Sequence, residues 1–327
     1  MIKKIMLWAL VILVGLAVVF VLGPREPADE TITFNAANMG SDLDAYLAGE
    51  EAKVPNIKPG AQKQIIWHEP TSKAKTEFSV VYVHGFSAAL EEVRPLPDIV
   101  AEAFDANIFY TRLAGHGRDG DAMAEASAND WYNDTAEALA IGRAIGDRVI
   151  VISTSTGGTL VSWAATKPEL MNNISALVMM SPNYGVQAAG SEALSMPWAR
   201  YILPLVFGKE RSWEPKNEEQ GKWWSTKYPN VALLPMQASV NTAAELPFEK
   251  MNVPALFIFH PEDGVVKSDI TREIAKRWGS ESGKTATIHE VTDSKDTFNH
   301  VIAGRILSPA NTQPLAEKAI EWIRSLN

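Results

Sequence analysis

The sequence predicts an α/β protein whose mostly parallel central sheet is covered by helices on both faces. Two observations predict this class. Runs rich in β-branched and aromatic residues alternate with segments of helical periodicity from about residue 64 to the C-terminus. Several of these runs are apolar throughout, as in strands that are buried on both faces. Such alternation favours parallel strands joined by helical connections.

The first half of the chain carries the strongest strand signal, FSVVYV at 78–83. After it, five apolar residues fall on one helical face at helical spacing: Leu96, Ile99, Val100, Ala103 and Phe104. We therefore expect strands at 64–67, 78–83 and 107–111, a helix at 96–104, and an earlier short helix near 42–51.

The second half continues the alternation. Residues 131–145 predict a helix that Asn129 or Asp130 caps, and the apolar run RVIVI at 148–152 predicts the next strand. A short helix at 158–166 ends before Pro168. Further strands are expected at 176–180, 255–259 and 286–291, and a closing helix carries Leu315, Ala319, Ile323 and Leu326 on one side.

The N-terminus predicts a membrane segment. Residues 5–23 contain no charged side chain, and nineteen helical residues span about 28 Å, close to the hydrocarbon thickness of a bilayer. Lys3 and Lys4 favour a cytoplasmic N-terminus, with the rest of the chain on the extracytoplasmic side, periplasmic or extracellular. The alternative is a cleaved signal peptide and a secreted protein, although no small-x-small cleavage site is evident.

We therefore expect four regions. Residues 1–25 form the membrane anchor or signal peptide, and residues 26–62 form a tether with a short helix. Residues 63–327 form one α/β domain. Within it, residues 184–250 are an insertion between two core strands.

Composition excludes several classes of function. The chain has no cysteine, which excludes disulfides, thiolate metal sites and a cysteine nucleophile. The net charge is −9, and without residues 1–25 it becomes −12, from 27 basic and 39 acidic residues. A body this acidic is a poor candidate for binding nucleic acid through phosphates.

Ser155 is the candidate nucleophile. It follows the apolar 148–152 strand by three residues and directly precedes the start of a glycine-rich helix, where a sharp turn holds a hydroxyl above the sheet. The usual signature is G-x-S-x-G, and here Ser153, another small residue, takes the place of the first glycine. The other reading of this pentapeptide is a plain strand–turn–helix junction.

A serine nucleophile needs a base, and His300 is the best candidate because it lies in a loop between the last strand and the closing helix. His289 falls inside a strand pattern, and a structural role is expected for it. Asp263 is the candidate carboxylate that orients the base, with Glu262 as the alternative. Taken alone, Asp263 before a glycine is an ordinary turn residue.

The His84-Gly85-Phe86 sequence follows the 78–83 strand. A structural role is expected for His84, whereas Gly85 lets the chain turn so that the next amide faces the site. The backbone N–H groups of Phe86 and Thr156 are therefore the candidate oxyanion donors.

The order Ser155, Asp263, His300 is that of the α/β-hydrolase fold. The sequence resembles this family, and most of all its monoacylglycerol-lipase-like and carboxylesterase-like serine hydrolases. The resemblance also rests on the motifs at 84–86, 112–117 (RLAGHG), 130–134, 263–266 and 299–301. It implies an α/β-hydrolase fold with a helical cap at the insertion, a catalytic Ser155, Asp263 and His300, and oxyanion amides at Phe86 and Thr156.

In the family that the chain resembles, the cap shapes the acyl pocket. The insertion is rich in aromatic residues, most of which are expected to form the core of the cap. Trp223 and Trp224 are adjacent and point different ways, so one of them is a candidate for contact with substrate or a membrane surface.

We expect a serine hydrolase that cleaves carboxylic esters, either of short or medium acyl chains or of monoacyl lipids. Its chemistry needs no metal and no organic cofactor, and its membrane partner is reached through residues 5–23. An amidase or peptidase is the alternative, because the same triad cleaves either bond. A tethered binding module on a hydrolase fold that has lost catalysis is a third hypothesis, which the intact Ser, Asp and His set disfavours.

Overall fold

One central sheet organises the protein. Within residues 2–326, which the computed structural model describes, its seven strands lie in the order β1-β3-β2-β4-β5-β8-β9. Only β1 runs antiparallel to its neighbour. The strands are β1 (Gln64–Ile66), β2 (Thr76–Val83), β3 (Asn107–Tyr110), β4 (Gly146–Thr154), β5 (Ile174–Met180), β8 (Ala255–Phe259) and β9 (Thr287–Glu290). The predicted fold class is confirmed.

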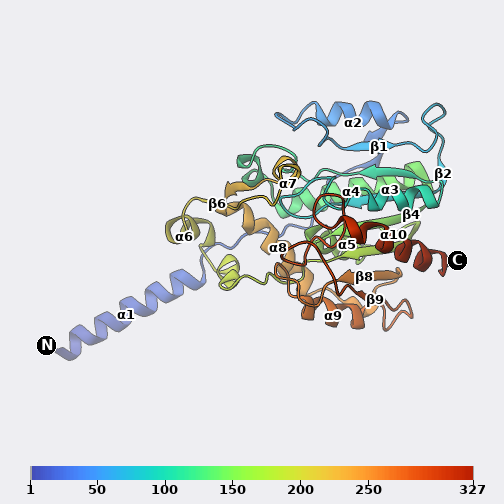
Figure 1. Cartoon of the computed structure of the whole chain (residues 1–327). Helices are drawn as coiled ribbons and strands as arrows, with labels where there is room; N and C mark the ends of the chain where they lie inside the picture. The colour runs from blue at the N-terminus through green and yellow to red at the C-terminus, as the bar shows by residue number, and fades with distance from the viewer. Residues whose placement is uncertain (1, 327) are drawn as a thin grey trace.

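Helices cover both faces of this sheet (Figure 1). Each face has its own hydrophobic core. Alternate residues of β2 show the division, because Val80 and Tyr82 join one core and Val81 and Val83 the other. The helices α3 (Leu96–Ala103) and α10 (Pro309–Arg324) pack in the first core. The second core takes α4 (Ala128–Ile145), α5 (Thr156–Ala164) and α9 (Ser268–Arg277).

Two helix starts differ from the prediction. Ser127, rather than Asn129 or Asp130, caps α4, because its backbone is extended and its hydroxyl accepts a hydrogen bond from the Asp130 amide. The Asp130 carboxylate in turn accepts from the Ser127 amide, which completes a capping box. The helix α5 begins at Thr156, two residues earlier than expected, so it starts directly after Ser155.

The insertion between β5 and β8 carries three helices and a two-stranded antiparallel sheet among its described elements. These are α6 (Ala199–Val206), β6 (Glu210–Ser212), α7 (Glu218–Trp223), β7 (Lys227–Pro229) and α8 (Leu233–Ala244). Figure 1 shows α6, β6 and α7 at the end of the molecule from which α1 (Ile2–Val21) projects. We refer to residues 184–250 as the cap.

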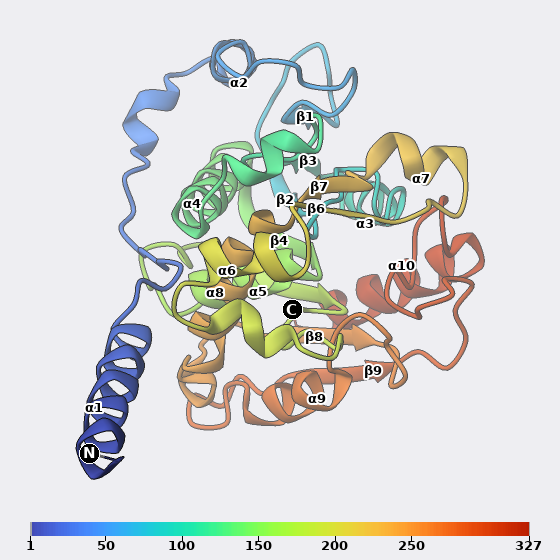
Figure 2. The same cartoon turned by 90° about the vertical axis from the view of Figure 1, so that its left-hand side faces the viewer.

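The helix α1 stands apart from the body, and none of its residues is buried (Figure 2). Over the described residues it is the one helix that is long and apolar enough to cross a membrane, and a signal sequence has the same character. Its apolar side chains therefore contribute nothing to the hydrophobic core.

The segment between α1 and the sheet lies along the body. The amides of Thr33 and Phe34 donate to Oδ1 of Asn133 on α4, and the indole of Trp163 donates to Glu30. Residues 30–34 are thus held along α4 and α5 before the chain reaches α2 (Leu43–Glu51).

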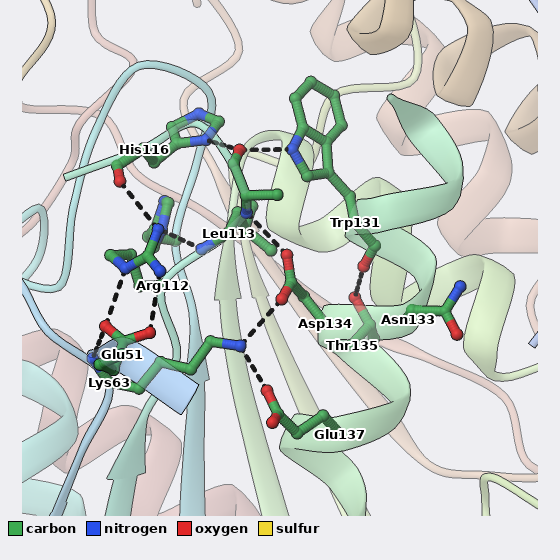
Figure 3. A network of polar contacts seen from close by, with 12 residues as sticks. Glu51, Lys63, Arg112, Leu113, His116, Trp131, Asn133, Asp134, Thr135 and Glu137 are labelled. Atoms are coloured by element: carbon green, nitrogen blue, oxygen red, sulfur yellow. Dashed lines mark hydrogen bonds and ion pairs between the residues drawn. The ribbon is translucent and has the colours of Figure 1, made fainter. Parts of the chain in front are cut away.

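A buried ionic network fastens α2 to the domain (Figure 3). Arg112 donates from Nε and Nη2 to the two carboxylate oxygens of Glu51, at 2.9 and 2.8 Å. Beside this pair, Lys63 contacts Asp134 at 2.9 Å and also Glu137. We call these five residues the Arg112 network. It joins the N-terminal segment to the loop that follows β3.

Candidate active site

Ser155 lies on a strained turn between β4 and α5. Its backbone has φ 52° and ψ −121°, a conformation that residues other than glycine rarely adopt. The turn is held because the Ser155 amide donates to the Met180 carbonyl of β5 and the Ser155 carbonyl accepts from Asn183. The surrounding strands therefore fix the serine at the carboxyl edge of the sheet, where sites of this fold class form.

Small residues around the turn allow close packing. A Cβ atom at Gly157 would lie 2.2 Å from the Val83 carbonyl oxygen, so only glycine fits where α5 begins against β2. Ser153, which stands where the usual signature has glycine, is completely buried. The turn thus forms with serine at that position.

His300 and Asp263 are in direct contact. Nδ1 of His300 donates to Oδ2 of Asp263 at 2.8 Å. The other carboxylate oxygen of Asp263 accepts from the amides of Val265 and Val266, which fixes its orientation. The hydrogen bond to Nδ1 leaves Nε2 of His300 as the nitrogen that can accept a proton.

Asp296 was not identified from the sequence. One of its carboxylate oxygens accepts from the amides of both His300 and Val301, at 3.0 Å each, and so holds the loop of the histidine. Burial by itself lowers the pKa of His300, but the negative charge and hydrogen bond of Asp263 outweigh it. Glu92 and Asp296 add to that effect, so the pKa of His300 lies above its ordinary value.

Glu92 is a second carboxyl group that the sequence did not reveal. It is buried, it lines the same cavity as Ser155, and it accepts from the Gly85 amide at 2.7 Å and the Tyr82 hydroxyl at 2.9 Å. Burial raises the pKa of Glu92, an effect that these two hydrogen bonds and His300 partly offset. Its place after β2, in a stretch without regular structure, gave no motif that could have identified it.

The loop after β2 lies against Ser155. A Cβ atom at Gly85 would come within 2.9 Å of the Ser155 Cβ, so glycine is needed for this approach. Among the described residues, neither the Phe86 amide nor the Thr156 amide donates to a partner, and both residues line the cavity. These are the two amides that the sequence predicts as oxyanion donors.

Two buried histidines brace this loop. Nδ1 of His84 donates to the Gly85 carbonyl and its Nε2 accepts from the Leu113 amide, while Nε2 of His116 accepts from the Ser87 amide. Burial lowers the pKa of His116 to about 4 and that of His84 well below its ordinary value, so both rings are neutral. The structure thus gives His84 the kind of contacts that a structural role requires.

A cavity of about 630 Å³ opens above Ser155, between the sheet and the cap. Ser155, His300, Glu92 and Asp296 lie in its wall with mostly apolar neighbours. The apolar and aromatic lining residues include Phe86, Val186, Leu194, Leu203, Phe207, Trp213, Trp224, Tyr228, Leu233, Met236, Val265 and Phe298.

The structure separates the remaining candidates. Trp224 lines the cavity, whereas Trp223 is buried outside the lining and its indole donates to Glu219. Asp263, and not Glu262, faces His300. Ser155 shares the cavity wall with His300, but its hydroxyl makes no hydrogen bond to any described residue.

His289 lies on β9, as the sequence predicts. In the described part of the chain, no group of three or more histidine or carboxylate side chains is placed to hold a metal ion.

Comparison with known proteins was made at the levels of sequence and structure. The sequence model of the alpha/beta hydrolase family matches residues 80–296. The chain is also 26% identical over 202 residues to a thermostable monoacylglycerol lipase of Bacillus sp. strain H-257, which covers 61% of this chain and 75% of that protein.

Solved structures share the fold. A structure from work on LipS and LipT, two metagenome-derived lipolytic enzymes, covers 83% of this chain and 100% of its own, with a TM-score of 0.66 and 22% identity. The monoglyceride lipase of Saccharomyces cerevisiae, in a soluble variant bound to a substrate analogue, covers 81% and 91% at a TM-score of 0.61 and 12% identity. The Paleococcus ferrophilus monoacylglycerol lipase covers 81% of this chain and 98% of its own, with a TM-score of 0.58 and 15% identity.

Proposed function

The chain belongs to the alpha/beta hydrolase family, and we propose that it cleaves carboxylic esters through Ser155, His300 and Asp263. Its relatives support activity of the lipase or esterase type. The observation that carries the finer proposal is the shared cavity wall. Ser155, on its strained turn, and His300, hydrogen-bonded to Asp263, both line one apolar cavity.

In the proposed reaction, the Ser155 hydroxyl attacks the ester carbonyl while Nε2 of His300 takes its proton. Asp263 holds the ring and stabilises its charged form. The amides of Phe86 and Thr156, which have no other partner among the described residues, receive the oxyanion of the tetrahedral intermediate. The C–O bond then breaks, and His300 returns the proton to the leaving alcohol.

Water completes the cycle. It attacks the acyl-enzyme while His300 accepts a proton from it, and collapse of the second tetrahedral intermediate releases the carboxylic acid and restores the Ser155 hydroxyl. Every proton passes through His300.

The substrate we propose is an ester with one acyl chain, of short or medium length or carried by a monoacyl lipid. The cavity is large enough for such a chain, and its lining is mostly apolar, so an acyl chain loses water contact when it enters.

We further propose that α1 remains as a single membrane span with the N-terminus in the cytoplasm. Lys3 and Lys4 support this orientation, which puts the catalytic domain on the extracytoplasmic side.

A fluorophosphonate probe tests the nucleophile. The probe is expected to label the wild-type protein at Ser155, as mapped by mass spectrometry, and to leave Ser155→Ala unlabelled. A folded wild-type protein that stays unlabelled, or a label at another serine, would contradict the proposed chemistry. Rates on ester and amide substrates that share one acyl group then separate an esterase from an amidase.

A further inference from the structure

The outer face of the cap helix α6 is apolar and uncovered. Tyr201, Leu205, Val206 and Phe207 keep 62%, 85%, 64% and 62% of their surface exposed. We call these four residues the α6 face. On the inner side of the same helix, Leu203 is buried and lines the cavity above Ser155. Phe207, which caps the end of the helix, belongs to the α6 face and also borders the cavity. One helix therefore forms both a wall of the cavity and an exposed apolar surface.

The chain that leaves α1 is fastened to the start of α6. The Trp198 amide donates to the Pro24 carbonyl at 2.7 Å, and the Trp198 indole donates to the Val19 carbonyl at 3.2 Å. Arg200 donates from two nitrogens to the carboxylate of Glu26, at 3.1 and 2.6 Å. The end of α1 and the start of α6 therefore lie side by side, and Figures 1 and 2 show both at the same end of the molecule.

This contact is closely packed. A Cβ atom at Gly23 would lie 1.8 Å from Nε1 of Trp198, so glycine is required there for the indole to lie on the chain. Arg25 adds a hydrogen bond to the Ser195 carbonyl. We call the contact of residues 19–26 with residues 195–200 the anchor–cap contact.

The position of the α6 face beside the end of α1 points to lipid as its partner. Lys209 follows this face, Arg200 is paired with Glu26, and Glu192 and Glu210 border the stretch 193–209, so local charge does not select the partner. Trp198 and Tyr201 add aromatic rings where the chain leaves α1. An exposed apolar face with aromatic rings at its edge, next to the end of a membrane-spanning helix, is typical of helices that lie in a membrane interface.

We propose that the α6 face rests in the surface of the membrane that holds α1, so that the cavity opens toward the lipid leaflet. An ester in that leaflet then passes along α6 to Ser155 without crossing bulk water. This inference rests on the proposed function and on the proposed membrane span. It adds to them a docking surface, with its residues, and a route for the substrate.

A depth measurement tests the docking without using activity. Because the chain has no cysteine, Leu205→Cys gives a single attachment site for an environment-sensitive fluorophore. In the full chain reconstituted in phosphatidylcholine vesicles, we expect this probe to be quenched by lipids with a nitroxide near the acyl carbonyl. The same probe at Glu281→Cys, an exposed position outside the cap, is the control and is expected to stay unquenched.

The anchor–cap contact predicts a second effect. Gly23→Val places a side chain where the Trp198 indole lies, so it is expected to reduce the quenching at position 205 while α1 remains in the vesicle. If the probe at position 205 stays in water although the wild-type chain is anchored, the docking proposal is wrong.

Rates on two substrates test the route. Leu205→Asp is expected to lower hydrolysis of a monoacylglycerol in phosphatidylcholine vesicles by about tenfold, because a charged residue weakens insertion of the α6 face. Hydrolysis of a water-soluble short-chain aryl ester is expected to change less than about twofold, and Leu205→Met should match the wild type on both substrates. Equal losses on the two substrates would overturn the route. If neither substrate is cleaved by the wild type, the proposed function fails, while the depth measurement still decides the docking.

Discussion

Two buried polar clusters in this protein differ in how their charges are matched. In the Arg112 network each cation faces at least one carboxylate and each carboxylate faces a cation. Glu51 and Arg112 are buried, while the side chains of Lys63 and Asp134 keep 9% and 14% of their surface exposed. In the candidate active site one imidazole, His300, lies among the carboxyl groups of Asp263, Glu92 and Asp296. That cluster also borders an open cavity.

The difference separates two uses of buried charge. A network in which every charged group already contacts an opposite charge is suited to holding α2 and the loop after β3 in place. In the active-site cluster, Nε2 of His300 and the Ser155 hydroxyl have no partner among residues 2–326, which leaves both groups available to a substrate. Substitutions in the first should therefore change stability, and substitutions in the second should change rate.

Ser155→Ala is expected to have the largest effect. Removal of the nucleophile should lower kcat by about 10⁵-fold or more, because the acyl-enzyme cannot form. The melting temperature should stay the same or rise, since the backbone strain at this position does not depend on the hydroxyl. Ser153→Ala, two residues away and also buried, is the matched control and should keep most of the activity. A fall of both kcat and the melting temperature in Ser155→Ala would contradict the proposed division.

Asp263→Asn is expected to lower kcat by about 10⁴-fold, because an amide no longer holds His300 in the required tautomer or stabilises its charged form. Binding of substrate should change little, so the loss should appear in kcat rather than in KM. Steady-state kinetics on a soluble ester give kcat and KM for this variant. Glu262→Gln, at the neighbouring position, is the control. A similar loss in the control would assign the acid role to Glu262.

Glu51→Gln tests the Arg112 network. It leaves the charge of Arg112 buried without its partner, which should lower the free energy of unfolding by about 3 kcal/mol. Denaturant unfolding gives this value. Glu50→Gln is the control on the same helix, because its pair with Lys53 is exposed and should contribute less than about 1 kcal/mol. Equal effects of the two substitutions would show that the network contributes no more than a surface ion pair.

Glu92→Gln is expected to have the smallest effect, mainly on the pH dependence of the rate. Glu92 raises the pKa of His300, so removal of its negative charge should lower that pKa. The proposed base is active when neutral, and its protonation limits the rate at low pH. The acid limb of the kcat/KM profile should therefore move to lower pH.

At the pH optimum, Glu92→Gln should change kcat/KM less than about tenfold, because the glutamine oxygen can still accept the Gly85 amide. An unmoved acid limb would mean that Glu92 is already neutral in the native enzyme.

The sequence predicted the elements that its patterns encode directly. The apolar strand runs placed Ser155, Asp263 and His300 after strands, and parallel strands bring such positions to one edge of the sheet. Glu92 and Asp296 were missed because each lies in a loop without regular secondary structure. Only their contacts in the folded protein show that they border the site. The helix α9 was missed because few of its residues are apolar. The capping role of Ser127 was missed because Ser127, Asn129 and Asp130 lie within four residues and each can cap a helix.

The short segment between α1 and the domain determines how far from the membrane the active site can reach. Residues 30–34 are bound along α4 and α5, and residues 19–26 take part in the anchor–cap contact. Even with that contact broken, the linker is at most residues 22–29, and eight extended residues reach about 28 Å. With α1 in a bilayer, the catalytic domain cannot reach a second membrane and stays in a thin layer above its own. Encounter with substrate then depends on how densely enzyme and ester populate that surface, so lipid composition, rather than bulk substrate concentration, would determine its working rate.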